Sequence, residues 1–230
     1  MRLLAARALV KSFHKTTGSV EVLRGVDFVL EPGEAVAIVG PSGAGKSTLL
    51  NLLGALDRPD SGTIERHGRP LRQHVPAEVT HWRRQVVGFV FQYHFLLPDF
   101  TARENLLLPV RLVEEPGAEA NRRADQLLAD VGLTDRADHR PGELSGGEQQ
   151  RIAVARAFMN KPSIVLADEP FGNLDQKIGS HLGDMLFGLR DREGTSLVIV
   201  THDLNLARQA DLILKLQDGK LLPAENPSSP

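Results

Sequence analysis

Residues 40 to 48 carry the strongest chemical pattern in the chain, a glycine-rich loop that ends in lysine, serine and threonine. The loop fits G-x-x-x-x-G-K-[ST], a pattern whose backbone cradles phosphate groups. An apolar stretch at 35–39 precedes it and a leucine-rich stretch at 49–53 follows it, which predicts a strand, a loop and a helix. The helix dipole and several backbone N–H groups then point at one anion. The predicted phosphate-binding residues are Gly40, Pro41, Ser42, Gly43, Ala44, Gly45, Lys46, Ser47 and Thr48.

Two side chains of this loop have distinct predicted roles. Lys46 adds a positive charge for the β- and γ-phosphates, and the hydroxyl of Ser47 can take a coordination position on Mg²⁺. The alternative is a glycine-rich turn that merely starts a helix. The flanking strand and helix patterns favour a site for a nucleoside triphosphate.

A second pattern is an apolar run, 164–167, that ends in Asp168 and Glu169. Ligands of open α/β sheets bind at the carboxyl ends of the strands, so these acids are expected to face the phosphate loop. Asp168 is predicted to hold Mg²⁺ through water, and Glu169 to polarise an attacking water as general base. The alternative is a strand that ends in a solvated acidic turn.

A third pattern, Leu-Ser-Gly-Gly-Glu-Gln-Gln-Arg at 144–151, places serine and two glycines directly before a predicted helix. Ser145 is a natural helix N-cap. Gly146 and Gly147 leave backbone N–H groups and the helix dipole free to meet an anion. Local physics alone also allows an ordinary helix start.

The alternation of strands and helices predicts how these patterns are positioned. We expect an α/β core with a mainly parallel sheet, preceded by antiparallel strands and interrupted by a mainly helical insertion near 92–157. One domain is predicted over 1–221, followed by a disordered tail at 222–230. The predicted strands are 3–13, 20–30, 35–39, 86–91, 164–167, 197–200 and 212–216, with turns at 16–19 and 218–219 and a hairpin-like region at 61–70. Helical patterns cover 49–56, 101–129 with a break at 115–118, and 148–159.

Composition limits the possible classes of protein. A chain of 230 residues can bury a large core. Its formal net charge of −2 does not indicate nucleic-acid binding, and the lack of cysteine excludes disulfides and thiolate metal sites. No apolar stretch reaches the roughly 20 residues that a membrane-spanning helix needs.

Taken together, these patterns resemble the motifs of ATP-binding-cassette (ABC) ATPases, and the resemblance covers essentially the whole chain. The segment 144–151 matches the signature motif of that family, Gln92 the Q-loop glutamine, 173–175 the D-loop and His202 the switch histidine. With the phosphate loop and the acidic strand, six motifs stand in the family's order. Phe13 stands where the family stacks an aromatic ring on adenine, although an alternating strand also needs phenylalanine for packing.

The resemblance implies a P-loop NTPase fold of the ABC type, with ATP and Mg²⁺ as cofactors. Lys46, Glu169 and His202 are the implied catalytic residues, and Ser47, Gln92 and Asp168 the implied metal ligands. Signature residues of one copy would complete the nucleotide site of a second copy in a head-to-tail dimer. The implied nucleotide-binding set outside the loop is Phe13, Gln92, Ser145, Gly146, Gly147, Asp168 and Asp175.

Residues 83–91 and 93–105 resemble one branch of the family, formed by lipoprotein-releasing, macrolide-exporter and cell-division ATPases, with the closest likeness to the lipoprotein-releasing type. That branch implies a separate peripheral chain on the cytoplasmic face of the bacterial inner membrane, bound to integral-membrane permease subunits. A simpler alternative is that Phe95, Leu96, Leu97 and Phe100 only pack the insertion.

Other assignments within and beyond the family stay open. They are a macrolide-export or cell-division system, a soluble ABC ATPase of translation or DNA repair, and an inactive regulatory cassette. A single motif set without a heptad run or basic patch disfavours the soluble type, and intact Lys46, Asp168, Glu169 and His202 disfavour the inactive type. Asn173 departs from the commonest D-loop pattern. The sequence does not name the cargo, because membrane subunits select it.

Overall fold

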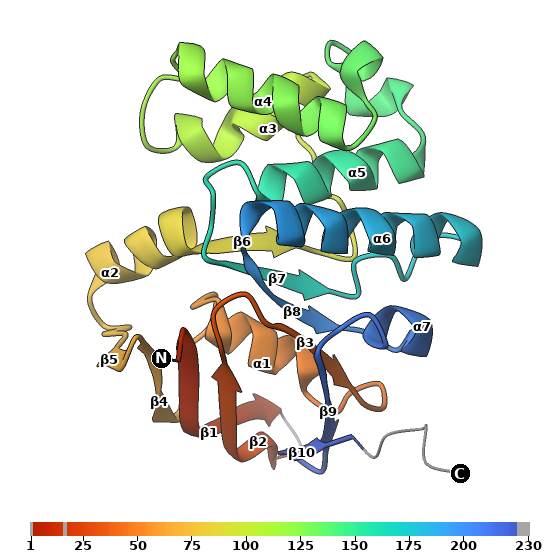
Figure 1. Ribbon diagram of the computed structural model, residues 1–230. Coiled ribbons are helices and arrows are strands. Elements are labelled where there is room, and N and C mark those ends of the chain that lie inside the picture. The colour runs from red at the N-terminus through yellow and green to blue at the C-terminus, as the bar shows by residue number, and fades with distance from the viewer. Residues whose placement is uncertain (1, 16–17, 225–230) are drawn as a thin grey trace. The chain divides into compact units, whose positions relative to one another are not determined.

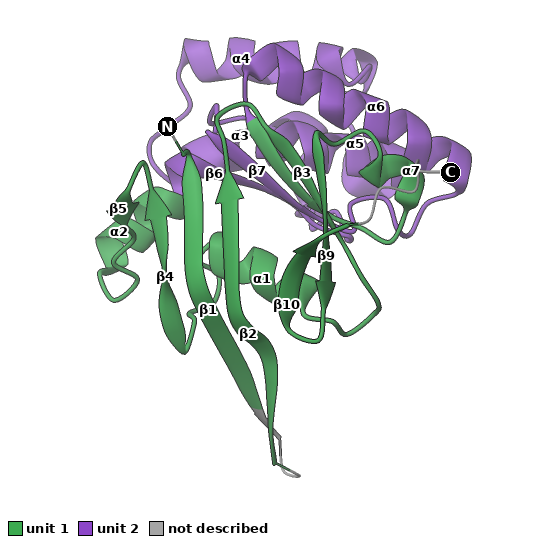
Figure 2. Ribbon diagram, turned by 60° about the horizontal axis from the view of Figure 1, so that its bottom comes forward, with its two compact units in different colours: residues 1–83, 196–230 green, residues 84–195 purple. Residues whose placement is uncertain are grey.

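Figure 1 shows the computed structural model, which describes residues 2–15 and 18–224. The chain divides into two compact units, coloured separately in Figure 2. Unit 1 comprises residues 1–83 and 196–230, and unit 2 comprises residues 84–195. Each unit has strands and helices of its own.

An antiparallel sheet forms the first part of unit 1. Inward-facing side chains of its second strand, among them Leu23, Val26 and Phe28, are buried, while their neighbours are exposed or half-buried. This alternation confirms the antiparallel strands predicted at 3–13 and 20–30. Two residues of the predicted turn, Thr16 and Thr17, lie outside the described residues. In sheet order the strands are β2 (Gly18–Leu30), β1 (Leu4–Lys15), β4 (Ser61–Arg66) and β5 (Arg69–Pro70).

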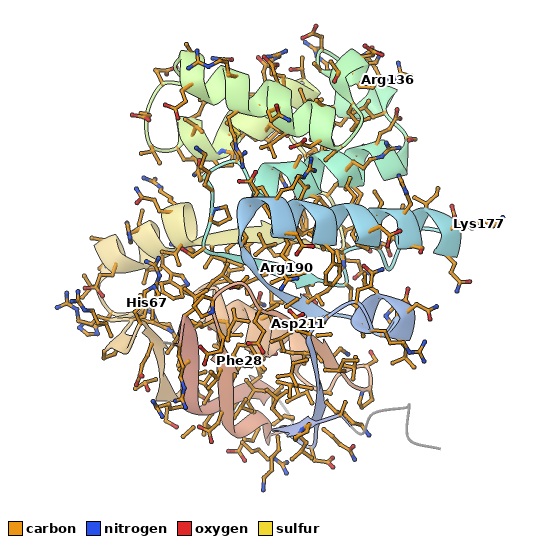
Figure 3. The ribbon with its side chains drawn as sticks, viewed as in Figure 1. Phe28, His67, Arg136, Lys177, Arg190 and Asp211 are labelled. Atoms are coloured by element: carbon orange, nitrogen blue, oxygen red, sulfur yellow. The ribbon has the colours of Figure 1, made fainter. Side chains whose placement is uncertain are left out.

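A second, mainly parallel sheet of unit 1 has β3 between two parallel neighbours, β8 and β9. Every residue of β8 is buried, which explains its unbroken apolar run. Asp211, labelled in Figure 3, accepts a hydrogen bond of 2.7 Å from the backbone N–H of Ala35 and so ties the start of β3 to the start of β9. The strands are β3 (Ala35–Val39), β8 (Ser196–Val200), β9 (Leu212–Gln217) and β10 (Lys220–Pro223).

β10 corrects one prediction. The sequence places a disordered tail from residue 222, but Leu222 and Pro223 pair with Lys215 and Leu214 of β9. Asp218 and Gly219, both with positive φ, form the predicted turn, yet the chain then returns as a strand. Residues 225–230 of the predicted tail lie outside the described residues.

The helices of unit 1 are short. The predicted helix after the glycine loop is present as α1, whereas α2, α7 and a π-helical turn, η1, were not predicted. Trp82 anchors η1, because its indole Nε1 donates a hydrogen bond of 3.0 Å to the carbonyl oxygen of Leu53 at the end of α1. The bounds are α1 (Lys46–Leu53), α2 (Pro76–His81), η1 (Trp82–Val86, its last three residues in unit 2) and α7 (Leu204–Ala207).

Unit 2 combines two parallel strands with a group of helices. The predicted strands at 86–91 and 164–167 are present, as are the helices on both sides of a break at 115–118. Helix α6 was not predicted. The elements are β6 (Val87–Val90), α3 (Ala102–Arg111), α4 (Ala118–Asp130), η2 (Thr134–Arg136), η3 (Pro141–Glu143), α5 (Gly146–Ala157), β7 (Ile164–Asp168) and α6 (Gln176–Glu193). None of the helices among the described residues is long and apolar enough to cross a membrane.

A buried asparagine organises the start of the helical region. Thr101 and Glu104 form a capping box at the start of α3. The fully buried Asn105 accepts a hydrogen bond of 2.8 Å from the N–H of Leu97, and its Nδ2 lies within 3.1 Å of the carbonyl oxygens of Leu97, Phe100 and Thr101. One side chain therefore holds the irregular segment 97–101 against α3.

Replacing Asn105 with leucine should destabilise the protein markedly. Leucine has a similar volume but leaves several buried backbone groups without partners, which costs about 3 kcal/mol. We expect the Tm to fall by roughly 5–10 °C in calorimetry. Asn121→Leu, at a partly exposed position of α4, is the matched control. Equal Tm values for the two variants would contradict the anchoring role of Asn105.

Candidate nucleotide-binding site

The glycine loop connects β3 to α1, as predicted, and two of its glycines are required by sterics. Gly40 has φ 150°, and a Cβ there would lie 2.3 Å from the carbonyl oxygen of Leu216. Gly45 has φ 99°, and a Cβ there would lie 2.5 Å from Cγ1 of Val22. A larger residue would require movement of the Leu216 backbone at position 40 and of the Val22 side chain at position 45.

Lys46 is held inside the loop that contains it. Its side chain is largely buried, and Nζ donates hydrogen bonds to the carbonyl oxygens of Gly40, at 2.9 Å, and Pro41, at 3.1 Å. A buried ammonium needs such partners. The positive charge of Lys46 thus lies at the start of α1. Gly45, the N-cap residue of this helix, provides no side-chain cap. A bound phosphate would meet both this ammonium and the helix dipole.

His202 lies at the same sheet edge as the glycine loop. Ile38 of β3 and Val200 of β8 are paired in parallel register, and both Gly40 and His202 stand two residues beyond that pair. The N–H of Thr201 continues the pairing with a hydrogen bond of 3.2 Å to the carbonyl oxygen of Ile38. Unit 1 alone therefore places His202, the predicted switch histidine, beside the predicted phosphate loop.

The acidic pair lies at the carboxyl end of β7 in unit 2. Asp168 is the last residue of the strand, and Glu169 follows with φ 43°. Left-handed backbone costs a non-glycine residue about 1–3 kcal/mol, and a residue before proline normally adopts an extended conformation. The N–H of Gly172 donates a hydrogen bond of 3.1 Å to the carbonyl oxygen of Glu169. Contacts with neighbouring residues must therefore stabilise the left-handed backbone conformation of Glu169.

Gln92 follows β6, the parallel neighbour of β7. Its Nε2 donates a hydrogen bond of 3.0 Å to Oδ1 of Asn173, and Nδ2 of Asn173 lies 3.5 Å from the carbonyl oxygen of Gln92. Since Nε2 is used in this way, Oε1 is the side-chain atom of Gln92 suited to a cation. Asn173, which the sequence marks only as an atypical residue of the D-loop, is thus a partner of Gln92. Asp175 caps α6 by accepting a hydrogen bond of 3.0 Å from the N–H of Ile178.

Ser145 is the N-cap of α5, as predicted, and forms a capping box with Glu148. The hydroxyl of Ser145 donates to Oε2 of Glu148 at 2.7 Å, and the N–H of Glu148 donates to Oγ of Ser145 at 3.3 Å. Hydrogen bonds from Ser145, together with the nearby guanidinium of Arg136, lower the pKa of Glu148. Arg136 is labelled in Figure 3. Gly146 and Gly147 form the first turn of α5.

Phe13 on β1 is 41% exposed, and Nζ of Lys11 lies 5.3 Å from the centroid of its ring. Its exposure argues against the alternative that the ring serves only to pack the sheet. An exposed aromatic face is suited to stacking on a planar base.

With this geometry established, comparisons with known proteins identify the family. A family model described as ABC transporter matches residues 23–172. The chain belongs to the ABC transporter family. As a cassette of this family it binds and hydrolyses ATP.

Curated relatives are similar over nearly their whole length. The chain is 50% identical to the lipoprotein-releasing system ATP-binding protein LolD of Bacteroides thetaiotaomicron, over 90% of this chain and 95% of the relative. It is 48% identical to the protein of the same name from Pseudomonas fluorescens, over 96% and 97% respectively.

Solved structures give the same result for the fold. The ABC transporter cassette MJ0796, in a dimeric structure, has a TM-score of 0.86 and 39% identity, covering 95% of this chain and 96% of that one. Its dimeric post-hydrolysis state bound to ADP and Pi has a TM-score of 0.85 and 38% identity, with the same coverage. The predicted ABC ATPase fold is therefore confirmed.

The capping box at Ser145 predicts a specific pH dependence. Folding lowers the pKa of Glu148 from its ordinary value of 4.5. The ionised carboxylate therefore stabilises the folded protein fully at pH values above 4.5, and this stabilisation is lost as the pH falls through the folded-state pKa. Glu148→Gln should therefore lower the Tm most near pH 7, and less at each step below pH 4.5. Thermal unfolding across this range checks the prediction, with exposed Glu119→Gln as control. A Tm difference independent of pH would contradict it.

Proposed function

We propose that this chain is the ATP-hydrolysing subunit of a bacterial ABC transporter complex that releases lipoproteins from the inner membrane. The observation that carries the proposal is the similarity to LolD proteins at 45–50% identity over at least 90% of the chain. The sequence resemblance of residues 93–105 to this branch also supports the proposal.

The nucleotide site is proposed to combine the loop 40–48 with residues from the other motifs. Backbone N–H groups of the loop and Lys46 would bind the β- and γ-phosphates. Ser47, Asp168 and Gln92 offer the oxygen donors that Mg²⁺ prefers, and this donor set fits the ion. Bound there, Mg²⁺ would neutralise phosphate charge. Phe13 would stack on the adenine ring.

Hydrolysis is proposed to depend on three side chains. Glu169 would accept a proton from the attacking water, while Lys46 and His202 would stabilise charge on the γ-phosphate. Asp168 would instead hold Mg²⁺ through water. This division of roles matches the positions of Asp168 as the last residue of β7 and Glu169 as the first beyond it.

A second copy of the chain is the proposed partner at the nucleotide. The first turn of α5, with Ser145, Gly146 and Gly147, would meet the γ-phosphate bound by the other copy, and Asp175 would lie at the same interface. The dimeric structures of a similar cassette support the pairing of two copies. Loss of the γ-phosphate would remove the bridging charge and loosen the dimer.

Integral-membrane permease subunits are the other proposed partners, which would place the chain at the cytoplasmic face of the inner membrane. Tyr93 and Phe95, directly after Gln92, are 63% and 61% exposed, and their ring centroids lie 6.2 Å apart. Leu96, in contrast, is buried. The segment thus serves both packing and the surface, and its exposed rings suit a protein contact.

Glu169→Gln should bind ATP but hydrolyse it about 10²- to 10⁴-fold more slowly, because glutamine cannot act as a general base. With ATP present, the variant should accumulate as a dimer in size-exclusion chromatography. Exposed Glu114→Gln is the control. Normal steady-state hydrolysis by Glu169→Gln would refute the assignment.

Lys46→Ala should weaken ATP binding about 10- to 100-fold, because it removes a charge-assisted contact to the phosphates. Isothermal titration calorimetry measures the affinity. Lys177→Ala, at an exposed position of α6 labelled in Figure 3, should leave it unchanged. Equal affinity of the Lys46 variant and the original protein would count against the phosphate-loop role.

The cargo is tested by co-purification. A tagged Glu169→Gln variant, expressed in its native host and solubilised with ATP present, should recover a permease pair together with lipoproteins. Recovery of a permease without lipoproteins would indicate another kind of ABC system, such as a macrolide-export or cell-division system, with a different cargo. Recovery of ribosomes or DNA-repair proteins instead of membrane proteins would overturn the transporter assignment.

A further inference from the structure

Gln150, on the second turn of α5, is a buried polar residue. The sequence motifs described above assign it no role of its own. It is only 3% exposed. A buried amide without hydrogen-bond partners would destabilise the fold. The partners of Gln150 therefore indicate which segments it stabilises.

Both hydrogen bonds of the Gln150 amide nitrogen go to loops that carry predicted site residues. Nε2 donates to the carbonyl oxygen of Phe91 at 2.9 Å and to that of Pro170 at 2.7 Å. Phe91 directly precedes Gln92, and Pro170 directly follows Glu169. One NH₂ group, which has two donors, therefore bridges two loops that are distant in the sequence.

The bridge bears on the unusual backbone of Glu169. This residue has φ 43°, and the peptide group that follows Pro170 includes the carbonyl that Gln150 binds. Uncommon backbone conformations persist only where their surroundings over-determine them. Gln150 supplies such a constraint from a helix rather than from another loop.

A second side chain of α5 also binds backbone carbonyls close to Gln92. Arg156 donates hydrogen bonds to the carbonyl oxygens of His94, at 2.7 Å, and Phe95, at 2.9 Å. Helix α5 therefore holds the segment around Gln92 on both sides, through Phe91 and through His94 and Phe95. The segment after Glu169 is attached to the same helix by Gln150.

We propose that Gln150 is a positioning residue for ATP hydrolysis, which fixes Glu169 and Gln92 to the helix that begins with the signature serine. The inference rests on the roles proposed above for Glu169 and Gln92. Gln150 would act on each of these residues through its hydrogen bond to the adjacent backbone carbonyl.

Replacement of Gln150 by methionine tests the proposal, because methionine has a similar length but no donor. We expect steady-state ATP hydrolysis by the full chain to show a kcat about 10- to 100-fold lower, with KM for ATP changed less than about threefold. Gln150→Glu, with the same shape and no N–H donor, should behave alike and decides the matter if the methionine variant does not unfold cooperatively.

Asn160→Leu is the matched control within unit 2. The amide Nδ2 of Asn160 also bridges two backbone carbonyls, those of Arg84 at 2.9 Å and Pro109 at 3.3 Å, but neither adjoins a predicted site residue. This variant should lower the Tm and leave kcat close to that of the original protein. An equal loss of kcat in the Asn160 and Gln150 variants would overturn the proposal, because the effect would then be one of general stability.

A double-mutant cycle separates this inference from the proposed function. If Gln150 acts by positioning Glu169, then adding Gln150→Met to Glu169→Gln should lower kcat by no more than about threefold further. A full additional loss would show that Gln150 does not act by positioning Glu169, and would overturn the proposal in that form. Normal hydrolysis by Glu169→Gln alone would instead refute the general-base assignment, whereas slow Glu169→Gln with normal Gln150→Met would refute only the present inference.

Discussion

The pairing of β3 with a parallel strand on each side, in the sheet of unit 1, is the constraint on which this unit's part of the site depends. β3 has a parallel partner on each side, so its backbone hydrogen bonds are satisfied and its end is fixed in position. The glycine loop starts from that end and packs against the neighbouring strands so closely that Gly40 and Gly45 have no room for a Cβ. The backbone that would face a phosphate is therefore shaped by the sheet before any ligand binds.

In unit 2, hydrogen bonds from side chains hold the loops that carry predicted site residues. Gln92 and Glu169 lie on loops, and a loop loses much conformational entropy when it is held in one arrangement. Buried amides and a guanidinium supply the compensating hydrogen bonds to loop carbonyls, from Asn105 on α3 and from Gln150 and Arg156 on α5. Two helices thus hold the loops around Gln92 and Glu169, and this gives an ATPase cassette rigid positions for groups that must act together.

The elements that were not predicted have identifiable reasons. Helix α6 contains Gly179, Gly183 and Gly188, which lower helix propensity, but Asp175 caps it and its leucines pack in the core. β10 includes Pro223, which favours a tail in the sequence, yet β10 is an edge strand where proline is tolerated. In both cases tertiary packing outweighs local propensity.

The residue types and spacings of the sequence by themselves determined the chemistry: the glycine loop with Lys46, the acids that end β7, the capped start of α5 and the histidine after β8. Each of these is a local pattern, because the residues involved are neighbours in the chain. Only the tertiary structure decided that Gln150 bridges Phe91 and Pro170 and that Gln92 pairs with Asn173, 81 residues away. Such bonds join segments that are far apart in the sequence, and their partners are backbone carbonyls or exposed amides that no residue pattern marks.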